Sequence, residues 1–277
     1  MPSEGSGTAG APLLLDGGLA TELQRAGLSV CSPWWTTAAL RDESDRRLLR
    51  QVHAAYVAAR ADVLTANTFR TNLRALERAG VSAELAVTYV QRAVADAVAA
   101  SKTADRQVSV AASVAPLEDC YQPSLVPDDR TLRVEHDWLL GALADTEVDL
   151  ILVETMNTSR EALTAARAST RRGLRTFVSF VCGDGGRLLS GEPIADAARR
   201  VEDANVEDRS SLPENMPVDQ YVPVRDGPDG FAGTAADWVE RYQLGVVGGC
   251  CGTTPEHIEA LAARLGGRRA SGRAAAT

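Results

Sequence analysis

Two adjacent cysteines, Cys250 and Cys251, are the residues of this sequence best suited to chemistry. They lie in the segment GGCCGTTP (248–255), between a short apolar run and a stretch with helical character. Thiolates are strong zinc ligands, and zinc takes sulfur and imidazole ligands in a tetrahedral shell. The flanking glycines let the backbone turn sharply and approach other groups closely. The pair therefore predicts a metal site, although two small residues could also simply fill a tight turn.

Two carboxylates occupy comparable positions at the ends of other apolar runs. Asp16 follows the run 12–15 and precedes a pair of glycines, and Glu154 follows the run 148–153. In a parallel barrel the carboxyl ends of the strands converge on one face. Two carboxylates and two thiols on that face would suit a cationic amine and a thiophilic metal. Each carboxylate also has a structural interpretation, because Asp16 could cap its turn and Glu154 the helix that follows.

Apolar runs and helix-like segments alternate along the chain, which predicts parallel strands joined by crossover helices. The predicted strands are 12–15, 62–66, 108–114, 148–153, 176–181 and 244–247. The predicted helices are 44–61, 82–100, 137–144, 193–201 and 235–242. A further helix is predicted to open at TSRE (158–161), which has the spacing of a capping box. This order predicts an α/β fold of the (β/α)8 TIM-barrel type.

One stretch, 202–228, does not fit this alternation. It should hold two more barrel strands, yet it is polar, contains four prolines and offers one weak strand candidate, Tyr221–Val224. Such a segment buries too little apolar surface to offset its ordering entropy, so we expect an irregular, mobile loop. The barrel is therefore expected to be incomplete or distorted around its sixth strand. The exposed strand edges would favour poor stability or self-association.

Length and composition limit the classes of protein. The 277 residues, 45% of them apolar, suit a single domain over 12–266 with disordered tails at 1–11 and 267–277. A net charge of −8 disfavours nucleic acid or anionic membranes as partners. No apolar run approaches the roughly 20 residues of a membrane span. Because the N-terminal segment lacks signal-peptide features, we expect a cytoplasmic protein with reduced cysteines.

Four segments resemble the zinc-dependent homocysteine S-methyltransferases, and together they place the likeness over most of the chain outside 202–228. They are LLLDGGLATELQRAG (13–27), ADVLTANTFRTN (61–72), ILVETM (151–156) and GGCCGTTPEHI (248–258). The resemblance implies a (β/α)8 homocysteine-binding barrel. It also implies transfer of a methyl group from a sulfonium donor, S-methylmethionine or S-adenosylmethionine, to homocysteine, giving methionine.

The resemblance further implies roles for individual residues. Cys250 and Cys251 match two of the family's three zinc-binding cysteines. Asp16 and Glu154 match the residues that hold the homocysteine amino group, with the backbone of Gly17 nearby. Zinc would deprotonate the homocysteine thiol, because the thiolate is the nucleophile. The family's third cysteine lies in a Gly-x-Asn-Cys segment after the sixth strand, and no Asn-Cys pair occurs in this chain.

Several alternatives remain open for this incomplete ligand set. Cys182, after the predicted strand 176–181, could supply the third thiol ahead of Cys120 and Cys31, or could be a small buried residue. The missing segment could reflect a deletion, a frameshift or true divergence. The chain could instead be a degenerate, non-catalytic barrel that binds a small amino acid or a partner, and zinc content would separate these readings. A redox role for the adjacent cysteines is disfavoured, because their disulfide closes a strained ring.

Overall fold

The computed structural model describes residues 12–183, 185–202, 207–208 and 227–274. Its parallel strands run in the order β2-β3-β4-β5-β8, and β9 pairs with β1 in a second parallel sheet. A bridge between Leu15 and Val63 joins β1 to β2. The strands are β1 (Leu13–Leu14), β2 (Val63–Ala66), β3 (Ser109–Val114), β4 (Leu150–Met156), β5 (Thr176–Phe180), β8 (Glu207–Asp208) and β9 (Val246–Val247). A short antiparallel hairpin is formed by β6 (Cys182–Gly183) and β7 (Arg187–Leu188).

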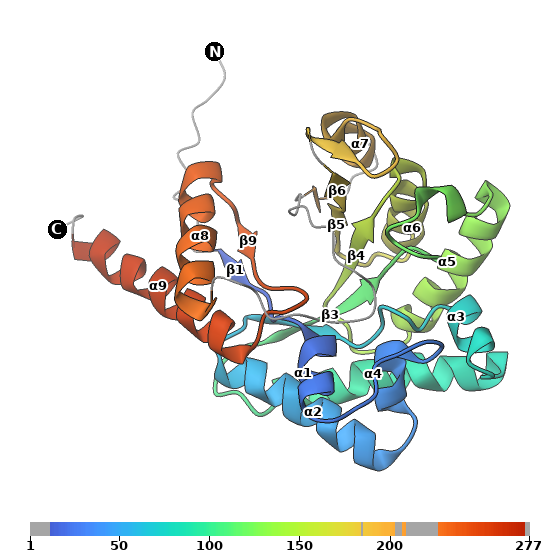
Figure 1. The fold of residues 1–277 in the computed structure, drawn as a ribbon, viewed down its shortest axis with the longest axis horizontal. Helices are drawn as coiled ribbons and strands as arrows, with labels where there is room; N and C mark the ends of the chain where they lie inside the picture. The colour runs from blue at the N-terminus through green and yellow to red at the C-terminus, as the bar shows by residue number, and fades with distance from the viewer. Residues whose placement is uncertain (1–11, 184, 203–206, 209–226, 275–277) are drawn as a thin grey trace.

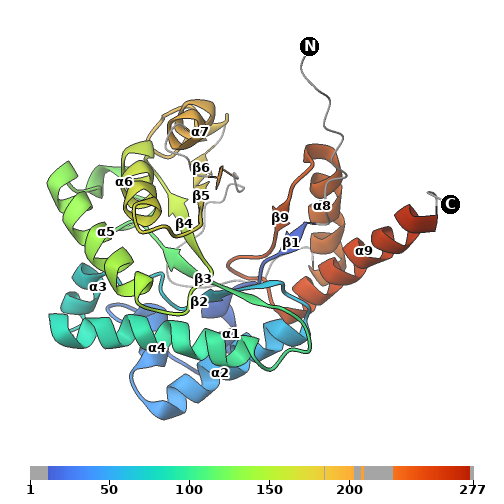
Figure 2. The ribbon, with the colours of Figure 1, turned by 180° about the vertical axis from the view of Figure 1, so that it is seen from behind.

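Helices alternate with these strands and pack around them, which confirms an α/β fold with parallel sheets. They are α1 (Leu19–Arg25), α2 (Glu43–Ala58), α3 (Leu73–Arg78), α4 (Ala83–Ser101), α5 (Asp129–Ala144), α6 (Ser159–Thr170), α7 (Ile194–Glu202), α8 (Gly227–Tyr242) and α9 (Pro255–Ala274), with 3-10 turns η1 (Trp35–Leu40) and η2 (Pro123–Leu125). Figures 1 and 2 show β1, β9, α8 and α9 on one side of the molecule and β4 with α5, α6 and α7 on the other. The helices α1, α2 and α4 lie below both groups in these views.

Side-chain caps fix where several helices begin. The Asp42 carboxylate accepts from two backbone N–H groups at the start of α2, and the hydroxyl of Ser82 accepts from Leu85 at the start of α4. The predicted capping box at 158–161 is only half formed. Thr158 caps α6 by accepting from Glu161 N at 3.3 Å, but the Glu161 carboxylate turns inward instead of back to the cap. This carboxylate is fully buried. There it accepts a hydrogen bond from the backbone N–H of Leu117 and contacts the buried side chain of His136.

All six predicted strands overlap observed strands, and the predicted helices overlap observed ones. The core explains why, since both faces of β3 and β4 are largely buried, one against helices and the other against residues of neighbouring strands. The largest apolar cluster packs residues of β3, β4 and β5 against α4, α5 and α6. A second cluster packs α2, α8 and α9 around β1 and β2.

The prediction of an irregular loop over 202–228 is wrong for Glu207–Asp208. These residues form β8 and pair in parallel with Phe177 and Val178 of β5. The edge of β5 offers backbone N–H and C=O groups that need partners, and a polar segment can satisfy them as well as an apolar one. The strand candidate Tyr221–Val224 lies outside the described residues, as does most of this stretch.

Two further expectations concern the ends of the chain and the closure of the barrel. The segment 267–277, expected to be a tail, continues α9 as far as Ala274, because its alanines and arginines favour helix. The tail predicted over 1–11 lies outside the described residues. In the described part of the chain the sheet is not closed, since β8 and β9 are its outer strands and do not pair with each other.

None of the helices in the described ranges is both long enough and apolar enough to cross a membrane.

Candidate functional site

The structure brings the Asp16 turn and the cysteine turn together. β1 and β9 pair in parallel, with Leu13 opposite Val246, so the turns that follow them leave the sheet side by side. The backbone N–H of Gly249 donates to the backbone oxygen of Asp16 at 2.9 Å. The two segments predicted to lie at strand ends are therefore neighbours in space. A bond between Gly18 and Thr253, for example, joins residues 235 positions apart in the sequence.

Asp16 is a buried carboxylate, 3% exposed, held by β2. Its two oxygens accept from the backbone N–H and the hydroxyl of Thr65, at 2.8 and 2.7 Å. Burial raises the pKa of Asp16 to about 7, because the two bonds from Thr65 offset only part of the desolvation. The charge of Glu154 raises this pKa further. Among the described residues, no cationic side chain forms a hydrogen bond or ion pair with Asp16.

Glu154 lies on β4 beside a break in the strand's regular pairing. The register between β4 and β5 shifts between Val153 and Met156, and Thr155 adopts φ +58°. A β-bulge of this kind re-aims a side chain, and such strained positions cluster at functional sites. Desolvation raises the pKa of Glu154, and the hydroxyl of Ser113 partly offsets the effect. The charge of Glu154 acts on Asp16 and on both cysteines of the turn, so these groups share one region.

The sulfur atoms of Cys250 and Cys251 lie 3.9 Å apart. The Cys250 thiol donates to the Cys251 sulfur, which lowers the pKa of Cys251 and raises that of Cys250. Zinc binds thiolates at about 2.3 Å in a tetrahedron, which places two sulfur ligands roughly 3.8 Å apart. The separation of the two sulfur atoms is therefore close to that of two corners of a zinc site.

A third ligand is not assembled with the pair. Across the described residues no group of three or more His, Cys, Asp or Glu side chains could hold a metal ion. Cys182 lies buried in β6, where desolvation raises its pKa. Cys120, in the loop after β3, is also buried, and its pKa is raised to about 11. Cys120 interacts electrostatically with both thiols of the pair, whereas Cys31 is exposed.

The histidines are structural. His53 is fully buried in α2, and desolvation lowers its pKa to about 4. His136, in α5, contacts the Glu161 carboxylate at 3.1 Å in the interface with α6. His257 lies in the first turn of α9, where its Nδ1 accepts from Thr254 N at 3.2 Å.

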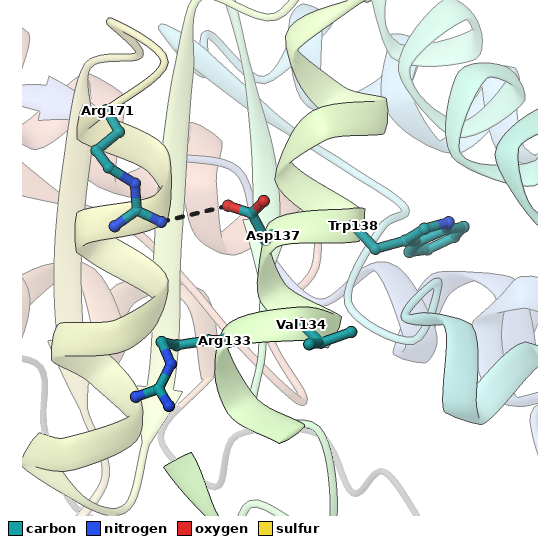
Figure 3. Close-up of a pocket in the computed structure, with 5 residues that line it drawn as sticks. All are labelled: Arg133, Val134, Asp137, Trp138 and Arg171. Atoms are coloured by element: carbon teal, nitrogen blue, oxygen red, sulfur yellow. Dashed lines mark hydrogen bonds and ion pairs between the residues drawn. The ribbon is translucent and has the colours of Figure 1, made fainter. Parts of the chain in front are cut away.

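Cavities elsewhere on the molecule do not coincide with these residues. A surface pocket of about 570 Å³ lies beside α5 and α6 and is lined by Arg133, Val134, Asp137, Trp138 and Arg171. Figure 3 shows the ion pair between Asp137 and Arg171 there, with Val134 and Trp138 pointing to the other side of α5. A second pocket, of about 440 Å³, includes Pro12 and Asp62 at the amino ends of β1 and β2. Neither of these two pockets is lined by Asp16, Glu154, Cys250 or Cys251.

Sequence reasoning does not single out the residues that surround the candidate groups. Thr65 and Ser113 lie inside predicted strands, where alternation alone does not tell which side chain faces the site. Thr253 lies within the GGCCGTTP motif and Tyr56 within the predicted helix 44–61, and neither pattern indicates a role in positioning the site. A usable signal for Thr65 and Ser113 was a hydroxyl residue within an otherwise apolar strand run.

We expect Gly249→Ala to destabilise the protein by about 1–3 kcal/mol, as overpacking of a tight site does. A Cβ at Gly249 would overlap the side-chain oxygen of Thr253, which is itself fixed by bonds to the backbone. Denaturant unfolding measures the change. Gly141→Ala is the matched control, since a Cβ there would meet only the end of Arg172 at 3.7 Å and should leave stability unchanged or slightly higher. Equal stabilities for the two variants would contradict the expected clash.

The sequence model of the family "Homocysteine S-methyltransferase" matches this chain over residues 13–213 and 209–265. The two matched pieces meet inside the stretch that breaks the strand and helix alternation. The selenocysteine Se-methyltransferase of Brassica oleracea var. italica is 27% identical over 312 aligned residues, covering 92% of this chain and 89% of the relative. The homocysteine S-methyltransferase YbgG of Bacillus subtilis is 26% identical and covers 91% of this chain and 93% of its own length.

Among solved structures, the metallated form of the homocysteine methyltransferase MmuM from Escherichia coli has a similar fold. The two superpose with a TM-score of 0.77 over 92% of this chain and 96% of MmuM, at 22% sequence identity. The family match spans nearly the whole described chain and includes Asp16, Glu154 and the two adjacent cysteines. This chain therefore belongs to the homocysteine S-methyltransferase family.

Proposed function

We propose that this protein transfers a methyl group from a sulfonium donor to the thiol of homocysteine, giving methionine, with zinc held by Cys250 and Cys251. The observation that carries the proposal is the direct bond between the Asp16 turn and the cysteine turn. It brings the Asp16 turn close to the Cys250–Cys251 turn, which supports an ammonium-binding carboxylate beside a pair of metal-binding thiols. An amino acid with a terminal thiol matches both chemistries at once.

Asp16 and Glu154 are proposed to hold the substrate's amino group. Both carboxyl groups are desolvated and each lacks a cationic partner among the interactions described above, so a substrate ammonium would relieve the repulsion between them. Charge-assisted hydrogen bonds to an ammonium are stronger than neutral ones and fix its direction. The backbone of Gly17 remains the candidate for a further contact, because no side chain fits there beside Tyr56 and Thr253.

Zinc, when bound, would supply the thiolate form of homocysteine at neutral pH. The transfer itself is a displacement at the methyl carbon. The homocysteine sulfur forms the new C–S bond, the bond from carbon to the donor sulfonium breaks, and its electron pair leaves on the neutral thioether. The homocysteine thiol proton is released. The protein's part is to aim the sulfur through the carboxylates Asp16 and Glu154, which is the entropic contribution that orientation makes.

We further propose that the fold is a (β/α)8 barrel that lacks part of its sixth unit. The alignment with the Brassica relative runs over 312 positions, more than the 277 residues of this chain. The family match also divides at 209–213. Cys182 is proposed as the third zinc ligand, which requires the sheet to rearrange. Cys120 is the alternative third ligand. A reducing compartment such as the cytosol suits these free thiols.

The alternative is a degenerate barrel that binds an amino acid without catalysis. It is favoured by one observation, the lack of a third ligand within the described residues. Incubation with zinc, homocysteine and either S-methylmethionine or S-adenosylmethionine, with methionine as the measured product, separates the two functions. Methionine formation supports the transferase, while zinc-free protein that binds homocysteine without turnover supports the alternative.

We expect the homocysteine affinity of the zinc-free protein to rise as pH increases toward about 7 and to level off above it, because the ammonium binds the charged form of Asp16. The pKa of Asp16 is raised to about 7 in the folded protein, so below that pH the carboxyl must lose a proton to bind. The same shift means that the folded state keeps a proton which the unfolded chain has lost. The contribution of Asp16 to the free energy of unfolding therefore falls as pH rises between about 4 and 7.

Calorimetry in buffers of different ionisation enthalpy counts the protons released on binding. More protons should be released at pH 6 by the wild type than by Asp16→Asn. Part of the release that persists in Asp16→Asn should come from Glu154, because its pKa is also raised. Equal proton release in both proteins would show that Asp16 is already charged before the substrate binds.

A further inference from the structure

Beside the bond from Gly249 to Asp16, several bonds of one residue, Thr253, join the turn that carries Asp16 to the turn that carries the two cysteines. Its hydroxyl donates to the backbone oxygen of Cys250 at 2.6 Å and accepts from the backbone N–H of Gly18 at 3.2 Å. Its backbone oxygen accepts from the same Gly18 N–H at 3.0 Å and from the hydroxyl of Tyr56 at 3.1 Å. Thr253 is 3% exposed, so water competes little with these bonds.

The space around the Thr253 hydroxyl is closed by glycine backbone. A Cβ at Gly249 would overlap the hydroxyl oxygen, and one at Gly17 would lie 2.8 Å from it. Tyr56, fully buried on α2, lies 3.0 Å from the same position at Gly17. The two turns and the helix behind them thus form one packed unit, in which the hydroxyl has no room to move.

This unit fixes the distance between two anchors. Asp16 lies in one turn and would hold the ammonium group, while the sulfur end of a substrate would sit at the cysteine turn. In an amino acid with a terminal thiol, that distance depends on the number of methylene groups. Homocysteine has one more than cysteine. A hydrophobic pocket distinguishes ligands that differ by one methylene only about 10- to 200-fold, so rigid spacing between polar anchors is a natural additional means of selection.

We propose that Thr253 is a positioning residue which sets the spacing between the ammonium anchor and the metal anchor and so makes the site select homocysteine over cysteine. The identity of the two anchors rests on the proposed function. The spacing itself rests on the bonds that Thr253 makes to Gly18 and Cys250.

The test compares dissociation constants for homocysteine and for cysteine on the zinc-loaded, full-length protein by calorimetry, without a methyl donor. Thr253→Val keeps the shape and removes the hydroxyl, whereas Thr253→Ser keeps the hydroxyl. Thr164→Val is the matched control, because the Thr164 hydroxyl bonds only within α6, to the Arg160 oxygen at 2.9 Å. Zinc affinity, measured by competition with a chelator, is a second readout that needs no substrate.

We expect the wild type to favour homocysteine and Thr253→Val to reduce that preference at least fivefold, together with weaker zinc binding. Thr253→Ser should restore the preference to within twofold, and Thr164→Val should match the wild type. Tyr56→Phe, which removes the bond to the Thr253 oxygen but keeps the ring, should reduce the preference by a smaller factor. It provides the decisive measurement if Thr253→Val does not fold.

The inference would be overturned if folded Thr253→Val kept the wild-type preference for homocysteine over cysteine. If Thr253→Val does not fold, an unchanged preference in Tyr56→Phe would overturn it. So would a wild type that binds both thiols equally, or a Thr253→Ser protein that behaves like Thr253→Val. Failure of methyl transfer is a separate result. A wild type that prefers homocysteine, loses that preference in Thr253→Val and yet forms no methionine would contradict the proposed function while leaving the positioning role in place.

Discussion

Cys250→Ala and Cys251→Ala are each expected to weaken zinc binding by more than ~100-fold, since removal of even an outer-shell partner of a metal ligand costs 10–100-fold. The reason is that the two sulfur atoms, 3.9 Å apart, are the ligand pair that the structure preassembles. Metal analysis after gel filtration, together with chelator competition, measures the loss. Affinity of the wild type should itself fall below that of a site with a complete set of three protein ligands.

Cys31→Ala is the matched control for these variants, because Cys31 is an exposed cysteine outside the site. It should retain the zinc content of the wild type. Equal zinc in the wild type, Cys250→Ala and Cys251→Ala would remove the metal assignment altogether. The same experiment on Cys182→Ala and Cys120→Ala identifies the third ligand, since only a ligand or its close support should lower the affinity.

Asp16→Asn and Glu154→Gln are each expected to weaken homocysteine binding by roughly 1.5–3 kcal/mol, the range for hydrogen bonds to charged groups. Both substitutions keep the size of the side chain and remove the charge that an ammonium would meet. Calorimetry on zinc-loaded protein gives the affinities, and the unfolding midpoint serves as the folding control. Asp145→Asn, an exposed carboxylate at the end of α5, should have no effect. Unchanged affinity in both site variants would rule out the ammonium role.

The strands could be predicted from the sequence because each is a short apolar run bounded by turn residues. Burial on both faces leaves such a run few alternatives to a parallel strand. The strand β8 could not be predicted, because Glu207 and Asp208 carry no apolar signal, although they pair with β5.

The candidate residues were predicted from their positions at the ends of strands in the sequence. The structure adds which of them lie together and what surrounds them. Asp16 and the cysteine turn lie together because β1 pairs with β9, a long-range pairing that no local pattern encodes. The rise in the pKa of Asp16 depends on its burial and on Thr65, which approaches from a neighbouring strand. The bulge at Thr155 depends on a register shift between two strands, which cannot be read from either strand alone.

The strand order places the two carboxylates that are proposed to bind the substrate's amino group in different parts of the sheet. Asp16 follows β1, which pairs with β9, and Glu154 belongs to β4, with β2 and β3 in between. The Asp16 turn and the cysteine turn share direct backbone bonds, whereas the separation of Asp16 and Glu154 depends on the curvature of β2, β3 and β4. If both carboxylates hold one ammonium group, a change in that curvature would weaken the hold on the amino group without moving the cysteine turn relative to Asp16.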